Sequence, residues 1–325
     1  MKDSIIAVCH YDAPSQTGKQ TLQTLNRIKK LLMKKQSLLR KQSHALCSLG
    51  LVGLLAATSV ACSQQAEPER PMPVAPEGTE RWVYNEAISD EFEGTSLDTA
   101  KWFDHNPSWI GRQPSLFRPE NVRVEDGMLI LTGRREEVKD APEGYHTFTT
   151  AAVQSTHKVL YGFFEIRCRP MRSALSSAFW LYISDSLKQE EIDIFEICGR
   201  HETDSTYPRT YFATSHYILK PQNVQISDHV THMSDVPWPD RTIVAGFKWT
   251  RDELVWYVDG KEIRRRKNDY WHSPETINFD SEAFPTWWGL PGEQDQGGEF
   301  QIEYFRYWTD PKSMDELTIF ENDMK

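Results

Sequence analysis

Cysteine is scarce in this chain of 325 residues, which contains five. Only Cys168 and Cys198 lie beyond residue 62, and we read both as structural. Their spacing matches no metal-binding motif, so no metal site is predicted. A disulfide between them would require an oxidising compartment and a proximity that the sequence does not establish.

Basic residues are also few once the first 62 residues are set aside. That segment holds nine Lys or Arg and two Asp or Glu, which leaves 28 basic and 45 acidic residues and a net charge of −17. So acidic a surface repels nucleic acid and anionic membranes, and we expect neither as a partner. An anionic ligand would have to meet a local cluster of arginine or lysine.

Long apolar runs are missing apart from one near the start. Residues 45–61 are apolar and follow several lysines and arginines, but the run is too short to read as a spanning helix. Residues 1–62 are therefore predicted to be an export leader. Residues 1–32 could be an over-extended start, because Met33-Lys34-Lys35 is a more natural one.

The leader ends at Ser59-Val60-Ala61-Cys62-Ser63, which resembles a bacterial lipoprotein cleavage site with Cys62 as the lipidated residue. Cleavage by ordinary signal peptidase is the alternative. Both give an exported bacterial protein, either an outer-membrane lipoprotein or one free in the periplasm or medium. Membrane contact is expected only through the lipid anchor.

The remainder divides into three parts. Residues 63–80 hold four prolines and almost no large apolar side chains, which predicts a stiff, extended tether. Residues 81–310 have the size of one domain. Residues 311–325 are predicted to be a short helix or a frayed tail.

Helical periodicity is absent from residues 81–310, and strand-like runs recur instead. Asp126-Gly127 and Asp259-Gly260 are hairpin signals between such runs. The pattern predicts an all-β fold, an antiparallel β-sandwich. The expected strands are 122–124, 128–133, 151–155, 162–169, 177–183, 191–197, 209–217, 242–249, 253–258 and 300–307.

Tryptophan is abundant, with 11 residues, and several lie beside polar or turn residues. Core packing explains some of them, since indoles fill sandwich cores. Exposed platforms for the apolar faces of sugar rings would explain the rest. The residues concerned are Trp109, Trp238, Trp271, Trp287 and Trp288.

Three carboxylates fall within six residues at Glu191, Asp193 and Glu196. Side chains on a strand alternate faces, so Glu196 joins the other two only if a β-bulge adds one residue. Clustered carboxylates raise at least one pKa, as is useful where an acid and a base act together. The alternative is an edge strand with solvated acids.

The segments around this cluster resemble the signature of glycoside hydrolase family 16. They are SAFWL at 177–181, YGFFEIR at 161–167, DEFEG at 90–94, WYVDG at 256–260 and IEYFRYW at 302–308. The resemblance covers about residues 85–308 in the expected order. It implies a curved jelly roll whose concave sheet forms the substrate cleft.

The segment WIGRQP at 109–114 is similar to the family branch that acts on red-algal galactans, as is EAFPTWWGLP at 282–291. That branch contains agarases, porphyranases, κ-carrageenases and furcellaran hydrolases. It implies that Trp109 and Arg112 bind substrate, and the planar fork of arginine suits a sulfate ester. Agarases usually carry Tyr-Gly where this chain has Cys198-Gly199, which argues against plain agarose.

The resemblance also implies a mechanism. Glu191 would be the nucleophile and Glu196 the general acid and then the base, as in retaining glycosidases. Asp193 would bond the nucleophile and help hold Glu196 protonated. Glu190 lies on the opposite face by alternation and is expected to be a bystander.

Three further residues are candidate substrate ligands. Trp180 would be a sugar platform, with a core position as the alternative. His216 would line the cleft or be structural, and Glu282 would bond a substrate hydroxyl. Residues 264–267 are expected to form a solvated, charged face rather than a sulfate site.

We therefore expect a monomeric endo-acting hydrolase that cleaves β-1,4-galactosidic bonds in a sulfated red-algal galactan. A laminarinase-like endo-β-1,3-glucanase and a non-catalytic, carbohydrate-binding lipoprotein are the alternatives. The partner is a polysaccharide, and no cofactor is required. Members of the family can carry a structural Ca²⁺ away from the cleft.

Overall fold

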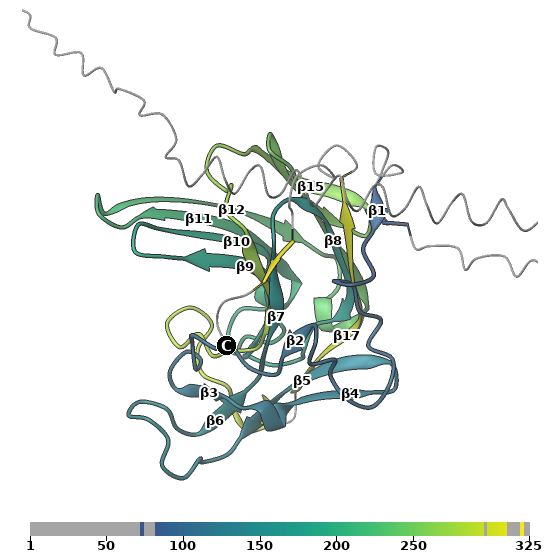
Figure 1. The fold of residues 1–325 in the computed structure, drawn as a ribbon. Helices are drawn as coiled ribbons and strands as arrows, with labels where there is room; N and C mark the ends of the chain where they lie inside the picture. The colour runs from purple at the N-terminus through teal and green to yellow at the C-terminus, as the bar shows by residue number, and fades with distance from the viewer. Residues whose placement is uncertain (1–71, 75–81, 296–297, 311–318, 322–325) are drawn as a thin grey trace, which may run out of the picture. The chain divides into compact units, whose positions relative to one another are not determined.

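The structure, a computed structural model, describes residues 72–74, 82–295, 298–310 and 319–321. Contacts divide the chain into Met1–Ala66, which lies outside these residues, and Glu67–Lys325. The described part of the second unit consists mainly of strands in two sheets that pack face to face (Figure 1). The predicted antiparallel β-sandwich is confirmed.

The first sheet has the order β15 (Lys261–Lys267), β14 (Glu253–Val258), β13 (Ile243–Trp249), β8 (Gly162–Arg169), β17 (Gly298–Thr309), β5 (Met128–Arg135), β6 (Phe148–Thr150) and β3 (Ser115–Phe117). In addition, β1 (Val83–Tyr84) pairs with β17, and β4 (Val122–Glu125) pairs with β5. The pair β3–β6 is parallel.

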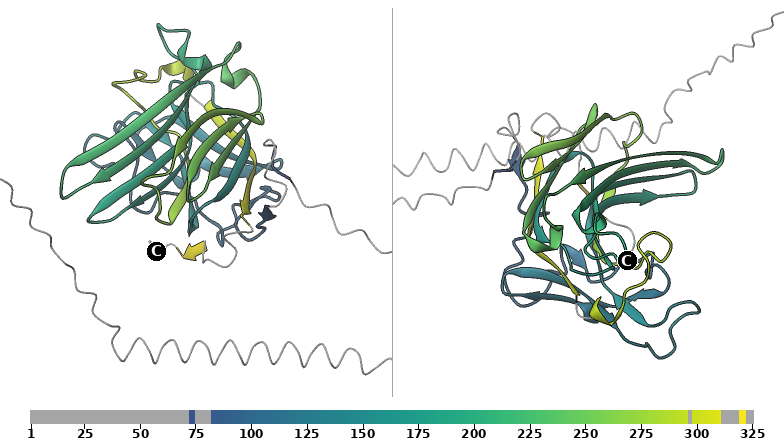
Figure 2. Two further views of the ribbon diagram at one scale, coloured as in Figure 1. Left: turned by 90° about the horizontal axis from the view of Figure 1, so that it is seen from above. Right: turned by 180° about the vertical axis from the view of Figure 1, so that it is seen from behind.

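The second sheet has the order β12 (Val224–Met233), β11 (Thr210–Leu219), β10 (Lys188–Cys198), β9 (Ser176–Ser184), β16 (Glu275–Asp280), β7 (Ala152–Val159) and β18 (Ile319–Glu321), with β2 (Trp102–Phe103) on β7. The hairpins β9–β10 and β11–β12 extend to the left in Figure 1, and Figure 2 shows their bowed course. Short 3-10 turns at Pro119–Asn121, Tyr207–Arg209, Trp238–Asp240 and Glu293–Asp295 are the helices of the described residues. None of them is long and apolar enough to cross a bilayer.

The core lies between the sheets and is rich in aromatic rings. Phe179, Phe279 and Phe305 contact one another with ring centroids 5.2–6.1 Å apart. Trp102 adds contacts to Phe279 and Phe305 at 5.4 and 5.5 Å. Each buried ring removes roughly 150–250 Å² from water, so this cluster fixes the second sheet against the first.

All ten predicted strands match observed ones, and β8 and β14 have the predicted bounds. The tail prediction was wrong at Ile319–Glu321, which form β18 rather than a helix or a frayed end. Of the predicted tether, the structure describes residues 72–74, where the backbone N–H of Val74 donates to Glu165 at 2.7 Å. The leader and Cys62 lie outside the described residues.

The two cysteines of the domain do not form a disulfide. Cys168 on β8 and Cys198 at the end of β10 are both free and buried, and they belong to different sheets. Burial raises the pKa of the Cys198 thiol to about 12, which leaves it unreactive. The prediction that both cysteines are structural is consistent with their burial.

Candidate active site

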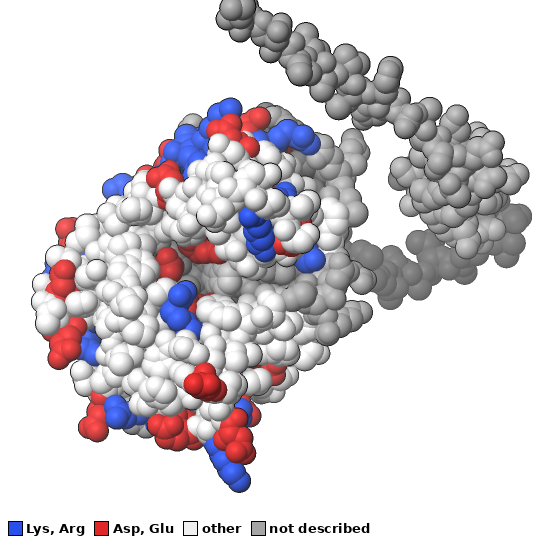
Figure 3. Space-filling view, turned by 90° about the vertical axis from the view of Figure 1, so that its left-hand side faces the viewer, with Lys and Arg blue, Asp and Glu red and all other residues white. Residues whose placement is uncertain are grey.

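A hollow of about 630 Å³ crosses the exposed face of the second sheet. Figure 3 shows it on the face turned to the viewer, with acidic and basic side chains in and around it. The structure brings together the three predicted catalytic carboxylates and four of the five candidate substrate ligands here. Its lining includes Trp109, Arg112, Trp180, Glu191, Asp193, Glu196 and Glu282.

The expected β-bulge is confirmed on β10. Asp193 pairs with Thr214 of β11, and Glu196 pairs with Phe212. Between these two pairs β10 contains one residue more than β11. The register against β9 shifts at the same place. Glu196 therefore joins Asp193 on the side of the hollow, while Ile194 and Phe195 are both buried in the core.

Two buried indoles donate hydrogen bonds to the backbone of the bulged strand β10. The Nε1–H of Trp256 donates to the carbonyl of Asp193 at 3.0 Å. The Nε1–H of Trp271 donates to the carbonyls of Glu191 and His216, both at 3.1 Å. The backbone that positions the carboxylates is thus fixed by packing and hydrogen bonds together.

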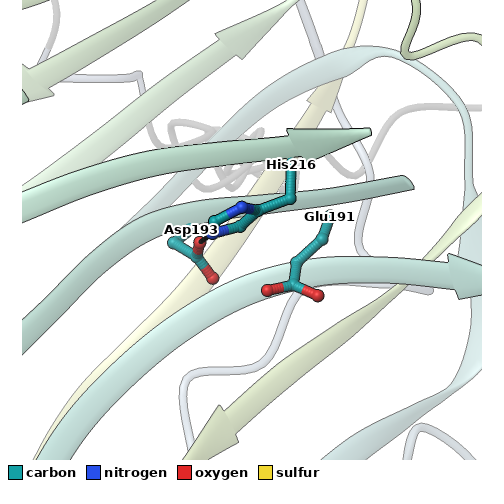
Figure 4. A group of neighbouring side chains, drawn as sticks. All are labelled: Glu191, Asp193 and His216. Atoms are coloured by element: carbon teal, nitrogen blue, oxygen red, sulfur yellow. Dashed lines mark ion pairs between the residues drawn. The ribbon is translucent and has the colours of Figure 1, made fainter. Parts of the chain in front are cut away.

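Glu191 and Asp193 lie side by side beneath His216 of β11 (Figure 4). The Nε2 of His216 is 3.6 Å from Oδ2 of Asp193, and Gln189 donates to Oε2 of Glu191 at 2.9 Å. Burial raises the pKa of Glu191, while His216 and Gln189 oppose this by favouring the carboxylate. His216 does not line the hollow itself, but it contacts the carboxylates that do.

The surroundings of Glu196 favour its protonated form. Burial, with the carboxylates of Glu282 and Glu191, raises the pKa of Glu196 to about 8, and Arg112 lowers it only in part. Burial and the neighbouring Glu191 and Glu196 also raise the pKa of Asp193 well above its usual range. One ionised and one protonated carboxyl can therefore coexist at neutral pH, which is the arrangement that a retaining glycosidase uses.

Arg112 and Glu282 form an ion pair at the wall of the hollow, with Nε and Oε2 2.7 Å apart. Glu282 is 7% exposed and Arg112 47%, and the guanidinium lies 4.4 Å from the ring centroid of Phe284. Among the described residues, neither terminal nitrogen of Arg112 donates a hydrogen bond, so these groups remain available. Glu282 thus holds Arg112 in place, a contact that the predicted role in bonding a sugar hydroxyl did not include.

Asp280 is a site residue that sequence reasoning missed. Its Oδ2 accepts a hydrogen bond from the indole N–H of Trp180 at 2.8 Å, and its side chain is buried. Trp180 is half-buried and meets Trp109 at 6.2 Å in an edge-to-face contact. The signal available was the alternation of Asp280 and Glu282, which places both acids on one face as a strand ends.

One group of potential metal ligands occurs among the described residues. Glu191, Asp193 and His216 place ligand atoms within 4.8 Å of one another. Glu191 and Asp193 line the hollow and His216 lies next to them, whereas the expected Ca²⁺ site would lie away from the hollow. The carboxylates are those that the proposed chemistry needs free, so we assign no ion to them.

Glu190 lies on the opposite face of β10, as predicted. It is fully buried and accepts hydrogen bonds from Ser273 Oγ and from the backbone N–H of His272 and Ser273. Lys188 pairs with it as well. Glu190 therefore anchors the loop before β16 and does not line the hollow.

The expected solvated face at residues 264–267 was wrong for Arg264. Its side chain is 3% exposed, lies 4.3 Å from the ring centroid of Trp256, and donates to the carbonyl of Ala213 and to Ser215 Oγ. We expect Arg264→Met to lower the free energy of unfolding by about 3 kcal/mol, because it removes these bonds and the cation–π contact.

Chemical denaturation measures this loss. The neighbouring Arg265, whose side chain is 44% exposed, is the control, and Arg265→Met should change stability by less than about 1 kcal/mol. Equal effects of the two substitutions would contradict a supporting role for Arg264.

A family model described as the GH16 domain of β-porphyranases A–D matches residues 82–309. The chain belongs to glycoside hydrolase family 16. The match covers the strands from β1 to β17 and the carboxylates of the hollow.

Curated relatives agree with this assignment. β-Porphyranase D of Zobellia galactanivorans is 36% identical over 165 residues, which are 47% of this chain and 36% of that protein. β-Porphyranase E of the same organism is 34% identical over 197 residues, or 57% of this chain and 69% of that protein. The chain thus spans about a third of the first relative and about two thirds of the second.

Solved structures show the same fold. Porphyranase B from Zobellia galactanivorans superimposes with a TM-score of 0.64 at 22% identity, covering 77% of this chain and all of that one. β-Agarase A in complex with oligoagarose gives 0.62 at 19% identity, covering 70% of this chain and 92% of that one. At 19–22% identity these comparisons show a shared fold.

Proposed function

We propose that this family 16 domain is an endo-acting, retaining glycoside hydrolase that cleaves β-1,4-galactosidic bonds in a sulfated red-algal galactan, with porphyran as the first candidate. The observation that carries the proposal is Arg112, fixed by Glu282 and Phe284 at the wall of the hollow that contains the carboxylates. A guanidinium with free terminal nitrogens suits the paired oxygens of a sulfate ester. The relatives named β-porphyranase support this choice.

In the proposed mechanism, Glu191 attacks the anomeric carbon while Glu196 donates its proton to the departing oxygen. A glycosyl ester on Glu191 and a shortened chain with a free hydroxyl result. Glu196, now ionised, takes a proton from water, whose oxygen attacks the anomeric carbon and releases Glu191. Burial and the carboxylates of Glu191 and Glu196 raise the pKa of Asp193, so in this mechanism Asp193 is a neutral neighbour of both.

A substrate panel tests the proposal. Purified protein is incubated with porphyran, furcellaran, κ-carrageenan, agarose and laminarin, and new reducing ends and product masses are measured. Proton NMR of the first product should show the β-anomer, as retention requires. Product from laminarin alone would favour a β-1,3-glucanase, and binding without any cleavage would favour a carbohydrate-binding lipoprotein.

Export through the leader and lipidation at Cys62 remain predictions.

Arg112→Gln should lower kcat/KM on the sulfated galactan by about 10- to 100-fold, the range for losing hydrogen bonds to a charged group. The loss should be much smaller on unsulfated agarose fragments, if these are cleaved at all. Arg167 is a matched control, because it is 45% exposed and pairs with Glu303 on the outer face of the other sheet. Equal losses on sulfated and unsulfated substrates would contradict the sulfate assignment.

A further inference from the structure

The lining of the hollow comes from β7, β9, β10 and β16, from Glu282 after β16, and from the segment before β3. No residue of β11 belongs to that lining. Glu196 pairs in register with Ala178 on the side of the hollow and with Phe212 of β11 on the other side. Because paired residues project to the same face of a sheet, Phe212 faces the substrate side as Glu196 does.

Phe212 belongs to a set of aromatic rings that contact one another outside the lining of the hollow. Trp287 meets Phe212 edge to face at 4.8 Å, and Tyr207 lies 6.0 Å from Phe212 on another side. His201 stacks on Tyr207 with ring centroids 4.5 Å apart and an interplanar angle of 12°. We call these four residues, His201, Tyr207, Phe212 and Trp287, the aromatic strip.

The aromatic strip stands on a rigid base. Trp287 packs on Trp288 at 4.5 Å and on Phe284 at 5.4 Å, and both of these rings are buried. The backbone N–H groups of Trp287 and Trp288 both donate to the carbonyl of Phe284, which closes a tight turn. Phe284 also carries Arg112 on its ring, so one loop supports both the ion pair and the strip.

Core packing alone does not account for the strip, because all four of its side chains are half-buried and keep part of their surface in solvent. Of the tryptophans beside polar or turn residues, Trp238, Trp271 and Trp288 are buried, whereas Trp109 and Trp287 are not. Trp109 lines the hollow. Of these two partly exposed tryptophans, Trp287 is therefore the one that does not line the hollow.

We propose that the aromatic strip binds sugar rings of the same polysaccharide, on the side of Glu196 opposite the hollow. The proposal rests on the proposed function, since an endo-acting hydrolase must hold sugars on both sides of the bond it cuts. The aromatic strip contains no Arg, Lys, Asp or Glu, so it suits the apolar faces of uncharged galactose units. Arg112 serves the other side, where a sulfate is expected.

The test uses Trp287→Ala and Tyr207→Ala on oligosaccharides of defined length and on the polymer. We expect each substitution to raise KM for long chains about fivefold to tenfold and to shift the size distribution of products. The kcat/KM for the shortest cleaved oligosaccharide should change less than twofold, and the pH profile should not move. Tyr84→Ala is the control, because Tyr84 is a half-buried aromatic on the other sheet, where it contacts Trp308.

Binding provides a second measurement that does not depend on turnover. In the Glu191→Gln background, calorimetry with a long oligosaccharide should show a weaker affinity when Trp287 is also replaced. Wild-type cleavage of a galactan with unchanged chain-length dependence in both variants would overturn the strip and leave the proposed function intact. A wild-type protein inactive on every galactan would overturn the proposed function and the strip with it.

Discussion

Glu191→Gln is expected to lower kcat on the preferred galactan by about 10⁴-fold or more, because the amide cannot form the glycosyl ester on which the proposed double displacement depends. The variant should still bind oligosaccharides, since glutamine has nearly the same shape as glutamate. The measurement is initial-rate kinetics with reducing-end detection, together with calorimetry of binding. Residual activity above about one per cent would contradict the assignment of Glu191 as the nucleophile.

Two further variants make this test specific. In Glu191→Ala, added azide should attack the anomeric carbon from the vacated side and give a glycosyl azide of inverted configuration, a product that only a lost nucleophile explains. Glu190→Gln changes the neighbouring carboxyl on the opposite face, whose partners are Lys188 and Ser273. It should lower Tm while leaving kcat within a few-fold of wild type.

Glu196→Gln is expected to lower kcat on the polymer by about 10²- to 10⁴-fold, the usual contribution of a general acid. In the wild type, activity should fall as pH rises through the pKa of Glu196, about 8, because only the protonated form can donate to the leaving oxygen. On the acidic side, activity should fall as Glu191 takes up a proton. Rate measurements across pH should therefore give a bell-shaped profile, without its alkaline limb in Glu196→Gln.

The alkaline limb should also respond to the neighbours of Glu196. Glu282→Gln removes a negative charge that raises the pKa of Glu196, so the limb should move to lower pH. Arg112→Gln removes a positive charge that lowers it, so the limb should move to higher pH. Glu303→Gln on the outer sheet is the control and should leave the limb in place. A limb that stays fixed in Glu196→Gln itself would contradict the acid assignment.

Strands with alternating or continuous apolar side chains were predictable, and β8 and β14 were predicted to the residue. The missed strands have physical reasons. β12 is exposed along most of its length because it forms the edge of the second sheet, so it has no buried face to produce a pattern. β15 reads KEIRRRK, and its sequence gives no sign that Arg264 is buried against Trp256.

The site divides in the same way. The bulge and the three carboxylates were predictable because they lie within one strand and depend on local spacing. The pair Arg112–Glu282 joins residues 170 positions apart, and the hydrogen bond from Trp180 to Asp280 spans 100. Contacts of that kind depend on strand order and loop packing, which a single sequence does not reveal. The aromatic strip likewise draws on three separate segments.

The extra residue at Ile194–Phe195 changes which side chains of β10 face the hollow and which face the core. Deleting one residue there would leave Glu191, Asp193 and Glu196 in strict alternation on the face of the hollow, with Ile197 still in the core. Straightening the strand without a deletion would instead turn Glu196 into the core and Ile197 out toward solvent. A strand of the present length that lost the bulge would therefore keep its place in the sandwich and lose the third carboxylate from the hollow.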